Sequence, residues 1–378
     1  MAHTSMNRAV SADIVRDPDK VRYKVMVVDD STVIRGFITR MLESDPEFKV
    51  VATAANGELA VKAVARVDVD VLILDIEMPV MDGLTALPLI LKANPKVKVL
   101  IASTLTRRNA AISIKALSSG ASDYVPKPDS AREAQASEKF HQELVRKIKA
   151  LTGLKRPRLT PAFGQTSAAT PVDGPKIALR QPSLFTPAVL AIGSSTGGPQ
   201  ALFKVFEGLK DRVKVPIFIT QHMPATFTAI LAEHLQRVCG VECAEGRDQE
   251  RVVANRIYLA PGEYHMVIDR DEDGNFIRIN QDPPENYCRP AVDPMFRSIS
   301  KLYGSRVLGV VLTGMGKDGR DGGQTIVNAG GTIIAQDEES SIVWGMPGAV
   351  ATAGVCSAVL PLTSIAPKIS RLLKGPGA

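Results

Sequence analysis

A serine flanked by glycines follows an apolar run in the C-terminal half of the chain. Gly193, Ser195 and Gly197 form the spacing Gly-x-Ser-x-Gly directly after residues 188–192. This spacing is typical of a sharp turn from a strand into a helix, which exposes the serine hydroxyl. A serine hydroxyl becomes a nucleophile only when a base accepts its proton, and a third group usually orients that base. The pattern therefore predicts the chemistry of a serine esterase.

Candidates for the base and the orienting acid follow two later apolar runs. His222 comes directly after VPIFITQ, and Asp318 lies in the glycine-rich segment that follows RVLGVVLTG. The reactive crevice of an open parallel sheet lies beyond the carboxyl ends of its strands. Because Ser195, His222 and Asp318 all follow predicted strand ends, we expect them to meet at one edge of one sheet.

Two of these positions have a neighbouring competitor. Ser194 competes with Ser195 as the nucleophile, but only Ser195 is centred between the two glycines. Asp321 competes with Asp318 as the acid, although Asp321 is also placed to cap a helix. A glycine-rich turn of this kind also resembles a nucleotide-binding loop, but it lacks the G-x-G-x-x-G spacing and the lysine of a P-loop.

Backbone N–H groups in the two glycine-rich segments are candidates to stabilise an oxyanion. Thr196 lies just before a predicted helix, where free N–H groups and the helix dipole favour negative charge. Met315 lies in the second glycine-rich segment. Its position makes its backbone N–H the other candidate.

A second group of polar residues follows predicted strands in the N-terminal half. Asp29 and Asp30 end the first strand, Asp75 ends the third, Ser103 ends the fourth, and Lys127 follows the fifth. Converging carboxylates repel one another unless a hard divalent cation neutralises them, and Mg²⁺ prefers oxygen ligands. A lysine at the same edge can pair with phosphate oxygens. The group therefore predicts a Mg²⁺ site suited to phosphoryl transfer.

Strand-like and helix-like segments alternate through both halves, which predicts two α/β domains. We expect a doubly wound, five-stranded parallel sheet in the first domain. We expect a three-layer second domain, with a mostly parallel sheet and an antiparallel hairpin over residues 265–281 at a sheet edge. The predicted divisions are an N-terminal tail (1–22), a first domain (23–151), a proline-rich linker (152–186) and a catalytic domain (187–378).

Composition places the chain among ordinary globular proteins. Of its 378 residues 45% are apolar and 23% are charged, and the formal charge is +6. No run of 18 uncharged apolar residues is present, so no membrane insertion is expected. The four cysteines have no metal-ligand spacing and are expected to be reduced, which fits a cytoplasmic protein. No predicted helix carries clustered arginine and lysine, so nucleic-acid binding is not expected.

The N-terminal half resembles the receiver domain of two-component response regulators, through VVDDS, LDIEMPVMDG and Tyr124 followed by Val-Pro-Lys-Pro. The resemblance implies that Asp75 accepts a phosphoryl group from a histidine kinase. It implies that Asp29, Asp30 and the backbone carbonyl of Glu77 join Asp75 in holding Mg²⁺. It also implies that Lys127 contacts the phosphate and that Ser103 and Tyr124 form the switch pair that reorients on phosphorylation.

The C-terminal half resembles the chemotaxis protein-glutamate methylesterase family, through IGSSTGGP, TQHMP and LTGMGKDG in that order, with YLAPG, RPAVDPMF and WGMPGAV. Ser194 departs from the alanine usual in the family. The resemblance implies hydrolysis of glutamate γ-methyl esters on methylated chemoreceptors, with release of methanol and no cofactor for that step. It also implies deamidation of receptor glutamines, and activation when phosphorylation relieves inhibition by the receiver.

Two other classes of function compete with this interpretation. A transcriptional response regulator has a receiver domain too, but its DNA-binding domain is shorter and carries a basic recognition helix. A non-catalytic signalling module would bind its partner through the same cleft and would not depend on the Ser195 hydroxyl.

Overall fold

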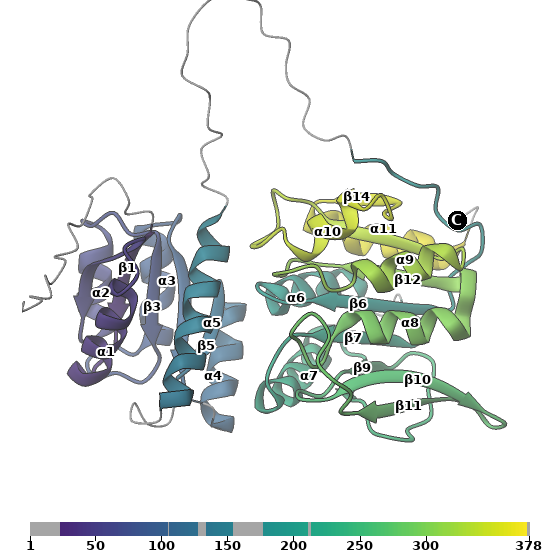
Figure 1. The fold of residues 1–378 in the computed structure, drawn as a ribbon, viewed down its shortest axis with the longest axis horizontal. Helices are drawn as coiled ribbons and strands as arrows, with labels where there is room; N and C mark the ends of the chain where they lie inside the picture. The colour runs from purple at the N-terminus through teal and green to yellow at the C-terminus, as the bar shows by residue number, and fades with distance from the viewer. Residues whose placement is uncertain (1–22, 105, 128–133, 154–176, 211–212, 376–378) are drawn as a thin grey trace, which may run out of the picture.

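The computed structural model consists of two α/β units (Figure 1). The predicted N-terminal tail and most of the predicted linker lie outside the described residues. The residues that the structure describes are 23–104, 106–127, 134–153, 177–210 and 213–375.

The first unit is built on a five-stranded parallel sheet in the order β2-β1-β3-β4-β5. Because alternate residues of a strand face opposite sides of the sheet, α1 and α5 pack on one face and α2, α3 and α4 on the other. Its elements are β1 (Tyr23–Val28), α1 (Thr32–Glu43), β2 (Phe48–Ala54), α2 (Gly57–Val64), β3 (Val71–Asp75), α3 (Gly83–Ala93), β4 (Lys98–Ser103), α4 (Arg107–Ser118), β5 (Asp123–Pro126) and α5 (Ala134–Thr152).

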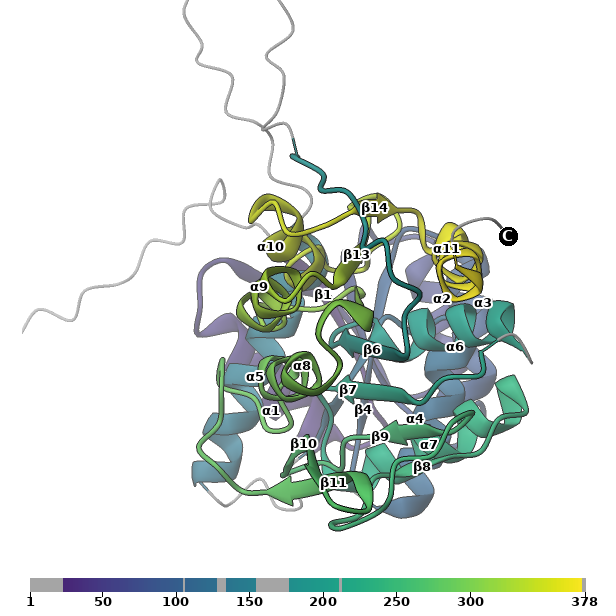
Figure 2. The same ribbon diagram turned by 90° about the vertical axis from the view of Figure 1, so that its right-hand side faces the viewer.

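The second unit is built on a seven-stranded parallel sheet in the order β14-β13-β12-β6-β7-β9-β8. Helices α6, α7 and α11 cover one face, and α8, α9 and α10 cover the other (Figure 2). The strands of the sheet are β6 (Val189–Ser194), β7 (Ile217–Gln221), β8 (Cys243–Glu245), β9 (Ile257–Leu259), β12 (Val307–Val311), β13 (Thr332–Gln336) and β14 (Ala358–Leu360). The helices are α6 (Gly198–Leu209), α7 (Ala225–Cys239), α8 (Val292–Tyr303), the short 3₁₀ helix η3 (Gly304–Arg306), α9 (Arg320–Asn328), α10 (Met346–Thr352) and α11 (Leu362–Lys374).

The predicted fold class is confirmed, but the predicted place of the hairpin is wrong. Strands β10 (His265–Asp271) and β11 (Gly274–Asn280) pair with each other and with no strand of the main sheet, so they form a separate two-stranded sheet. The backbone of residues 249–252 pairs with β11 through Ile277 and Asn275, so this loop takes the hydrogen bonds that a strand of the main sheet would otherwise make. The hairpin packs against α8.

A continuous apolar contact joins the two units. The ring of Tyr124 on β5 stacks on that of Phe227 on α7, with centroids 4.3 Å apart and planes 18° from parallel. Both side chains are buried, and one hydrophobic cluster runs from the α2–α4 side of the first unit to the α6–α7 side of the second. The interface between the two units therefore has an apolar centre.

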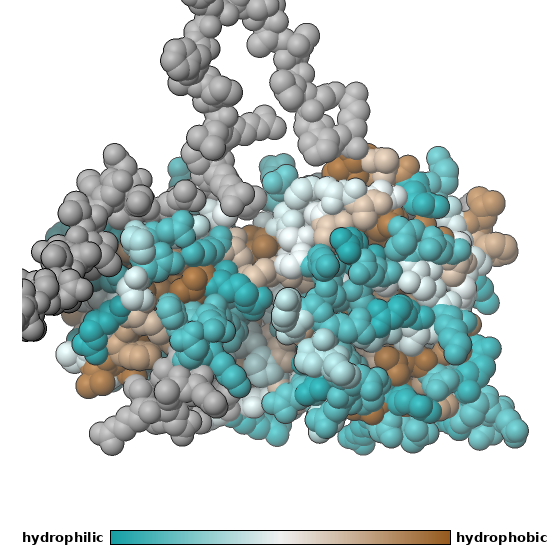
Figure 3. Space-filling model, viewed as in Figure 1, coloured by the Kyte–Doolittle hydropathy of each residue, from teal (hydrophilic) through white to brown (hydrophobic). Residues whose placement is uncertain are grey.

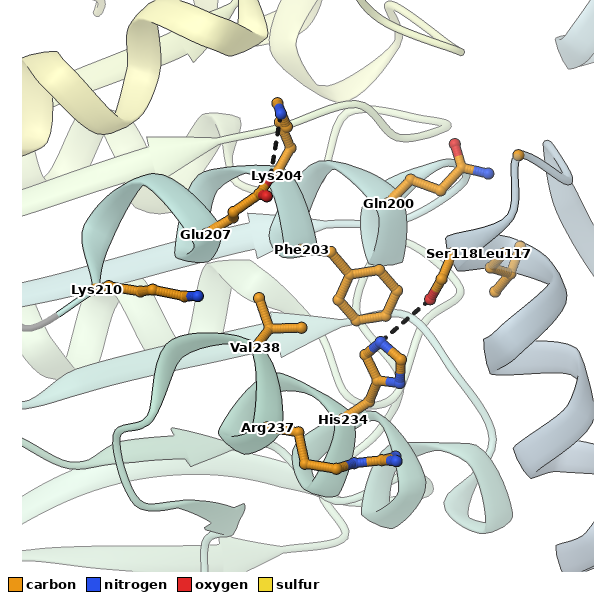
Figure 4. Close-up of a pocket in the computed structure, with 11 residues that line it drawn as sticks. Leu117, Ser118, Gln200, Phe203, Lys204, Glu207, Lys210, His234, Arg237 and Val238 are labelled. Carbon is orange, nitrogen blue, oxygen red and sulfur yellow. Dashed lines mark hydrogen bonds and ion pairs between the residues drawn. The ribbon is translucent and has the colours of Figure 1, made fainter.

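Polar contacts lie beside this apolar contact, where α4 meets α6 and α7. The hydroxyl of Ser118 lies 3.2 Å from Nε2 of His234, whose ring also packs on Phe203 (Figure 4). Arg107 pairs with Glu233 at 3.0 Å. Ser118, His234 and Phe203 border an open cavity of about 500 Å³. One face of α4 thus contacts the second unit along its length.

Hydrophilic side chains cover most of the face shown in Figure 3, and hydrophobic side chains form separate smaller areas. Exposed apolar side chains such as Val33, Val80 and Leu184 are spread over distant elements. Within the described residues, no helix combines the length and the apolar character that a membrane crossing requires.

Candidate active site

The structure brings His222 and Asp318 together at the carboxyl ends of β7 and β12. Nε2 of His222 lies 2.7 Å from Oδ2 of Asp318, and their side chains are 11% and 1% exposed. The competing acid, Asp321, lies outside the pair: it is exposed and bonds Arg320 at 2.8 Å. Geometry therefore favours Asp318 as the partner of His222.

Backbone N–H groups surround the Asp318 carboxylate. Oδ2 accepts from the backbone N–H of Val292 at 2.6 Å, and Oδ1 accepts from that of Asp293 at 3.0 Å. Both donors lie in the first turn of α8, where N–H groups have no partner within the helix. Oδ1 also accepts from Gly319 and from the amide of Asn286. The buried charge is thus solvated by peptide groups and by one end of a helix dipole.

This environment sets the charge of the pair. Burial lowers the pKa of His222, but hydrogen bonds with Asp318 and with the thiol of Cys288 outweigh it and raise the pKa to about 10. Burial raises the pKa of Asp318, and the bond with His222 and the surrounding N–H donors bring it below its usual value. The raised pKa of His222 and the lowered pKa of Asp318 both favour the charged forms, so the two side chains form an imidazolium–carboxylate pair.

Ser195 lies in the sharp turn between β6 and α6. Gly197 adopts a left-handed backbone (φ 73°) as the residue before α6, a conformation that favours glycine. The backbone N–H of Ser195 donates to Thr313 at 3.1 Å, which ties the turn to the segment after β12. The Ser195 hydroxyl lines the same cleft as His222 but forms no hydrogen bond with the described residues.

Ser194, the competing nucleophile, is buried and already bonded. Its hydroxyl donates to Oε1 of Gln221 at 2.7 Å. The amide of Gln221 then donates to the backbone carbonyls of Ser195 (2.9 Å) and His222 (3.1 Å). Gln221 therefore connects the turn that carries the serine to the segment that carries the histidine. Sequence reasoning missed it, although it directly precedes His222.

The two residues whose backbone N–H groups were expected to stabilise an oxyanion, Thr196 and Met315, line different hollows. Among the described residues, neither Thr196 nor Met315 finds an acceptor for its backbone N–H. Thr196 lines the cleft beside Ser195. The side chain of Met315 accepts a hydrogen bond from Arg146 of α5 at 3.0 Å through its sulfur.

Residues of both units form the walls of the cleft, whose volume is about 330 Å³. A second hollow of about 580 Å³ continues past His222 and Asp318 and is also bordered by α5. From the first unit, the cleft is lined by Asp123, Tyr124, Glu143, Arg146 and Lys147. The first unit therefore covers the approach to Ser195.

The predicted carboxylate group is assembled at the edge of the first sheet. One carboxylate oxygen from each of Asp29, Asp30 and Asp75 lies within 4.8 Å of the others. The ammonium of Lys127 lies 2.5 Å from Asp29 and 2.8 Å from Asp75. Burial raises the pKa of Asp75, and Lys127 opposes that rise. An oxygen-only donor set of this charge fits Mg²⁺.

The other receiver residues named from the sequence are Ser103, Tyr124 and Glu77. Ser103 and Tyr124 are both buried, at the end of β4 and on β5. Tyr124 is turned toward the second unit, as its stacking on Phe227 shows. The side chain of Glu77 is 3.8 Å from Arg108 of α4.

The chain matches two family models and many close relatives. The model described as CheB methylesterase matches residues 190–369, and the response regulator receiver domain matches residues 25–137. The protein-glutamate methylesterase/protein-glutamine glutaminase of Azospirillum brasilense is 54% identical over 362 residues, which cover 92% of each chain. A group 2 operon counterpart from Rhodospirillum centenum is 52% identical over 93% of this chain and 94% of its own. The chain belongs to the CheB methylesterase family.

A crystal structure of a CheB methylesterase catalytic domain, from Thermotoga maritima, is also similar. It is 36% identical in sequence, with a TM-score of 0.48, and the match covers 50% of this chain and 100% of that domain. The resemblance to a receiver followed by a methylesterase domain is confirmed by the two family models.

The raised pKa of His222 predicts a steep alkaline rise in the activity of this CheB-family chain. An imidazole accepts a proton only when it is neutral, and a pKa of about 10 leaves it protonated at neutral pH. We expect kcat/KM for ester hydrolysis to rise about tenfold per unit above about pH 7. Asp318→Asn should shift the rise to lower pH and lower its plateau. A pH–rate profile, corrected with Ser195→Ala for alkaline hydrolysis, checks this, and a flat profile would contradict it.

Proposed function

We propose that this chain is a phosphorylation-activated serine esterase that hydrolyses glutamate γ-methyl esters on chemoreceptors and releases methanol. The observation that carries the proposal is the buried His222–Asp318 pair, whose histidine lines one cleft with Ser195. The names of the relatives supply the substrate class and a second activity, deamidation of protein glutamines. On this proposal the enzyme acts in the cytoplasm, on the helices of the receptors.

The mechanism follows from which atoms are occupied. Nε2 of His222 is bonded to Asp318, so Nδ1 is the nitrogen that accepts the Ser195 proton as the hydroxyl attacks the ester carbonyl, once the imidazole has given up its bond with Cys288. The free N–H groups of Thr196 and Met315 donate to the oxyanion. His222 returns the proton to the leaving methanol, and then activates the water that releases glutamate. Deamidation follows the same course with ammonia as the leaving group.

The serine and the histidine must come closer for this reaction, because they share a cleft without sharing a hydrogen bond. In the structure the imidazole is bonded to Asp318 and to Cys288. On this proposal, rotation of the Ser195 or His222 side chain closes the relay. Such tightening on substrate binding is common in hydrolases.

Asp75 is the proposed phosphoacceptor, and a histidine kinase of the chemotaxis system is the proposed donor. Asp29, Asp30, Asp75 and the backbone carbonyl of Glu77 would hold Mg²⁺, which neutralises charge on the transferred phosphoryl oxygens when bound. Lys127 already bridges two of these carboxylates and is placed to contact the phosphate.

The receiver is proposed to gate the cleft by covering it. Tyr124 stacks on Phe227 of α7, the helix that begins three residues after His222. Reorientation of Ser103 and Tyr124 on phosphorylation would remove this stacked contact from the interface. The equilibrium between a covered cleft and an open cleft would then shift toward the open one.

Replacing the nucleophile should abolish activity, and the adjacent serine offers a matched control. We expect Ser195→Ala to lower kcat on the order of 10⁴- to 10⁶-fold. Ser194→Ala should keep most of the activity and lose about 1–3 kcal/mol of stability, because Gln221 loses a buried donor. Methanol release from methylated receptor membranes and thermal denaturation measure both. Full release by Ser195→Ala would reject the mechanism.

Weakening the α4–α7 contact should raise activity in the absence of a phosphoryl donor. Arg107 and Glu233 form an exposed pair at 3.0 Å, which contributes about 0.2–1 kcal/mol. We expect Arg107→Glu or Glu233→Arg alone to raise basal methanol release about 1.4- to 5-fold, and the double exchange to return it toward the starting value. A double-mutant cycle without coupling would argue against gating by this interface.

A further inference from the structure

A tight turn beside the active site carries two residues with unusual backbone angles. Glu285 and Cys288 exchange backbone hydrogen bonds of 3.1 and 2.9 Å across the turn. The two residues between them, Asn286 and Tyr287, both have left-handed backbones, with φ of 51° and 64°. Asparagine is among the residues that tolerate this conformation. The turn holds the Asn286 side chain in place with little freedom of the backbone.

The Asn286 amide bridges two buried carboxylates. Its Nδ2 donates to Oδ2 of Asp293 at 2.9 Å and to Oδ1 of Asp318 at 3.2 Å. Asp293 and Asp318 are 2% and 1% exposed, and two negative groups so close together repel each other. Within the described part of the chain, no other side chain bonds both of them.

Backbone groups satisfy the remaining oxygen of Asp293. Its Oδ1 accepts from Gly322 at 2.7 Å and from Gly319 at 3.0 Å, at the start of α9. Its backbone N–H donates to Asp318. Burial and the nearby Asp318 raise the pKa of Asp293 to about 6, and the bonds from Gly322 and Asn286 oppose that rise.

We infer that Asn286 is a positioning residue for the reaction: its amide screens Asp293 from Asp318 and fixes the carboxylate that orients His222. Backbone N–H groups of Val292, Asp293 and Gly319 hold the Asp318 carboxylate, and the Asn286 amide adds a side-chain donor to Oδ1. Because His222 bonds the other oxygen, Oδ2, the amide helps to fix the rotation of the carboxylate that faces the imidazole. A rotated carboxylate would aim the imidazole away from Ser195. The inference rests on the proposed function, because orientation matters only if His222 is the base.

The test is Asn286→Gly in the full chain, since glycine accepts the left-handed backbone and removes the side chain with its amide. We expect kcat for methanol release to fall about 10- to 100-fold with KM within about twofold, the range typical when a partner behind a catalytic ligand is lost. The matched control is Asn255→Gly. Asn255 has φ of 58°, is exposed and lies outside the cleft, so its variant should keep the starting kcat.

Asn286→Asp keeps the shape of the side chain and replaces the donor with a third carboxylate. Because the added carboxylate repels Asp293 and Asp318, we expect a larger loss of kcat than for Asn286→Gly. If the glycine variant does not fold, Asn286→Asp tests the positioning role instead. An unchanged kcat in either folded variant, or a loss confined to KM, would overturn the inference. Ser195→Ala distinguishes failure of the proposed esterase mechanism from failure of the positioning role. If Ser195→Ala abolishes methanol release while Asn286→Gly does not, only the positioning role of Asn286 fails.

Discussion

The carboxylate of Asp318 has to stay charged in a place that water hardly reaches. An ion buried without partners would cost several kcal/mol, so the fold must supply donors in its place. It does so with the first turn of α8, the glycine-rich segment before α9, and the imidazole of His222. These donors come from three separate elements. Satisfying one charge therefore fixes the start of α8 against the ends of β7 and β12, where the rest of the site is built.

The short strand β5 links the two chemical sites of the molecule. Its Tyr124 reaches the second unit, while Lys127, just after the strand, bonds the carboxylates at the other site. Lys147 of α5 holds the strand in place, since its ammonium bonds the Tyr124 carbonyl at 2.6 Å and Asp123 at 3.0 Å. Lys127 is therefore only three residues from Tyr124, whose ring contacts the second unit. A movement of Lys127 toward a phosphoryl group can reach that contact through a short stretch of backbone.

The sequence predicted those parts of the site that follow long, buried parallel strands. Ser195, His222 and Asp318 each come after a strand of five or six buried residues, which an apolar run reveals. Strands β8 and β14 have three residues each, too few for an alternating pattern to show in the sequence. Gln221 and Asn286 act through hydrogen bonds to residues far apart in sequence. Such hydrogen-bond partners depend on tertiary packing, and no local sequence pattern predicts them.

In the structure, where the first unit lies against the second, the His222–Asp318 pair is already formed although access to the cleft is restricted. His222 and Asp318 are already bonded while the first unit borders the cleft, so phosphorylation has no need to build the pair. The proposed substrate is a helix, and a helix with its side chains is about 10–12 Å across. The cleft of about 330 Å³ has no room for one while α5 forms its wall. If the proposed gating holds, substrate and receiver compete for one surface, and the stability of contacts such as Tyr124 on Phe227 sets the fraction of molecules whose cleft is open to substrate.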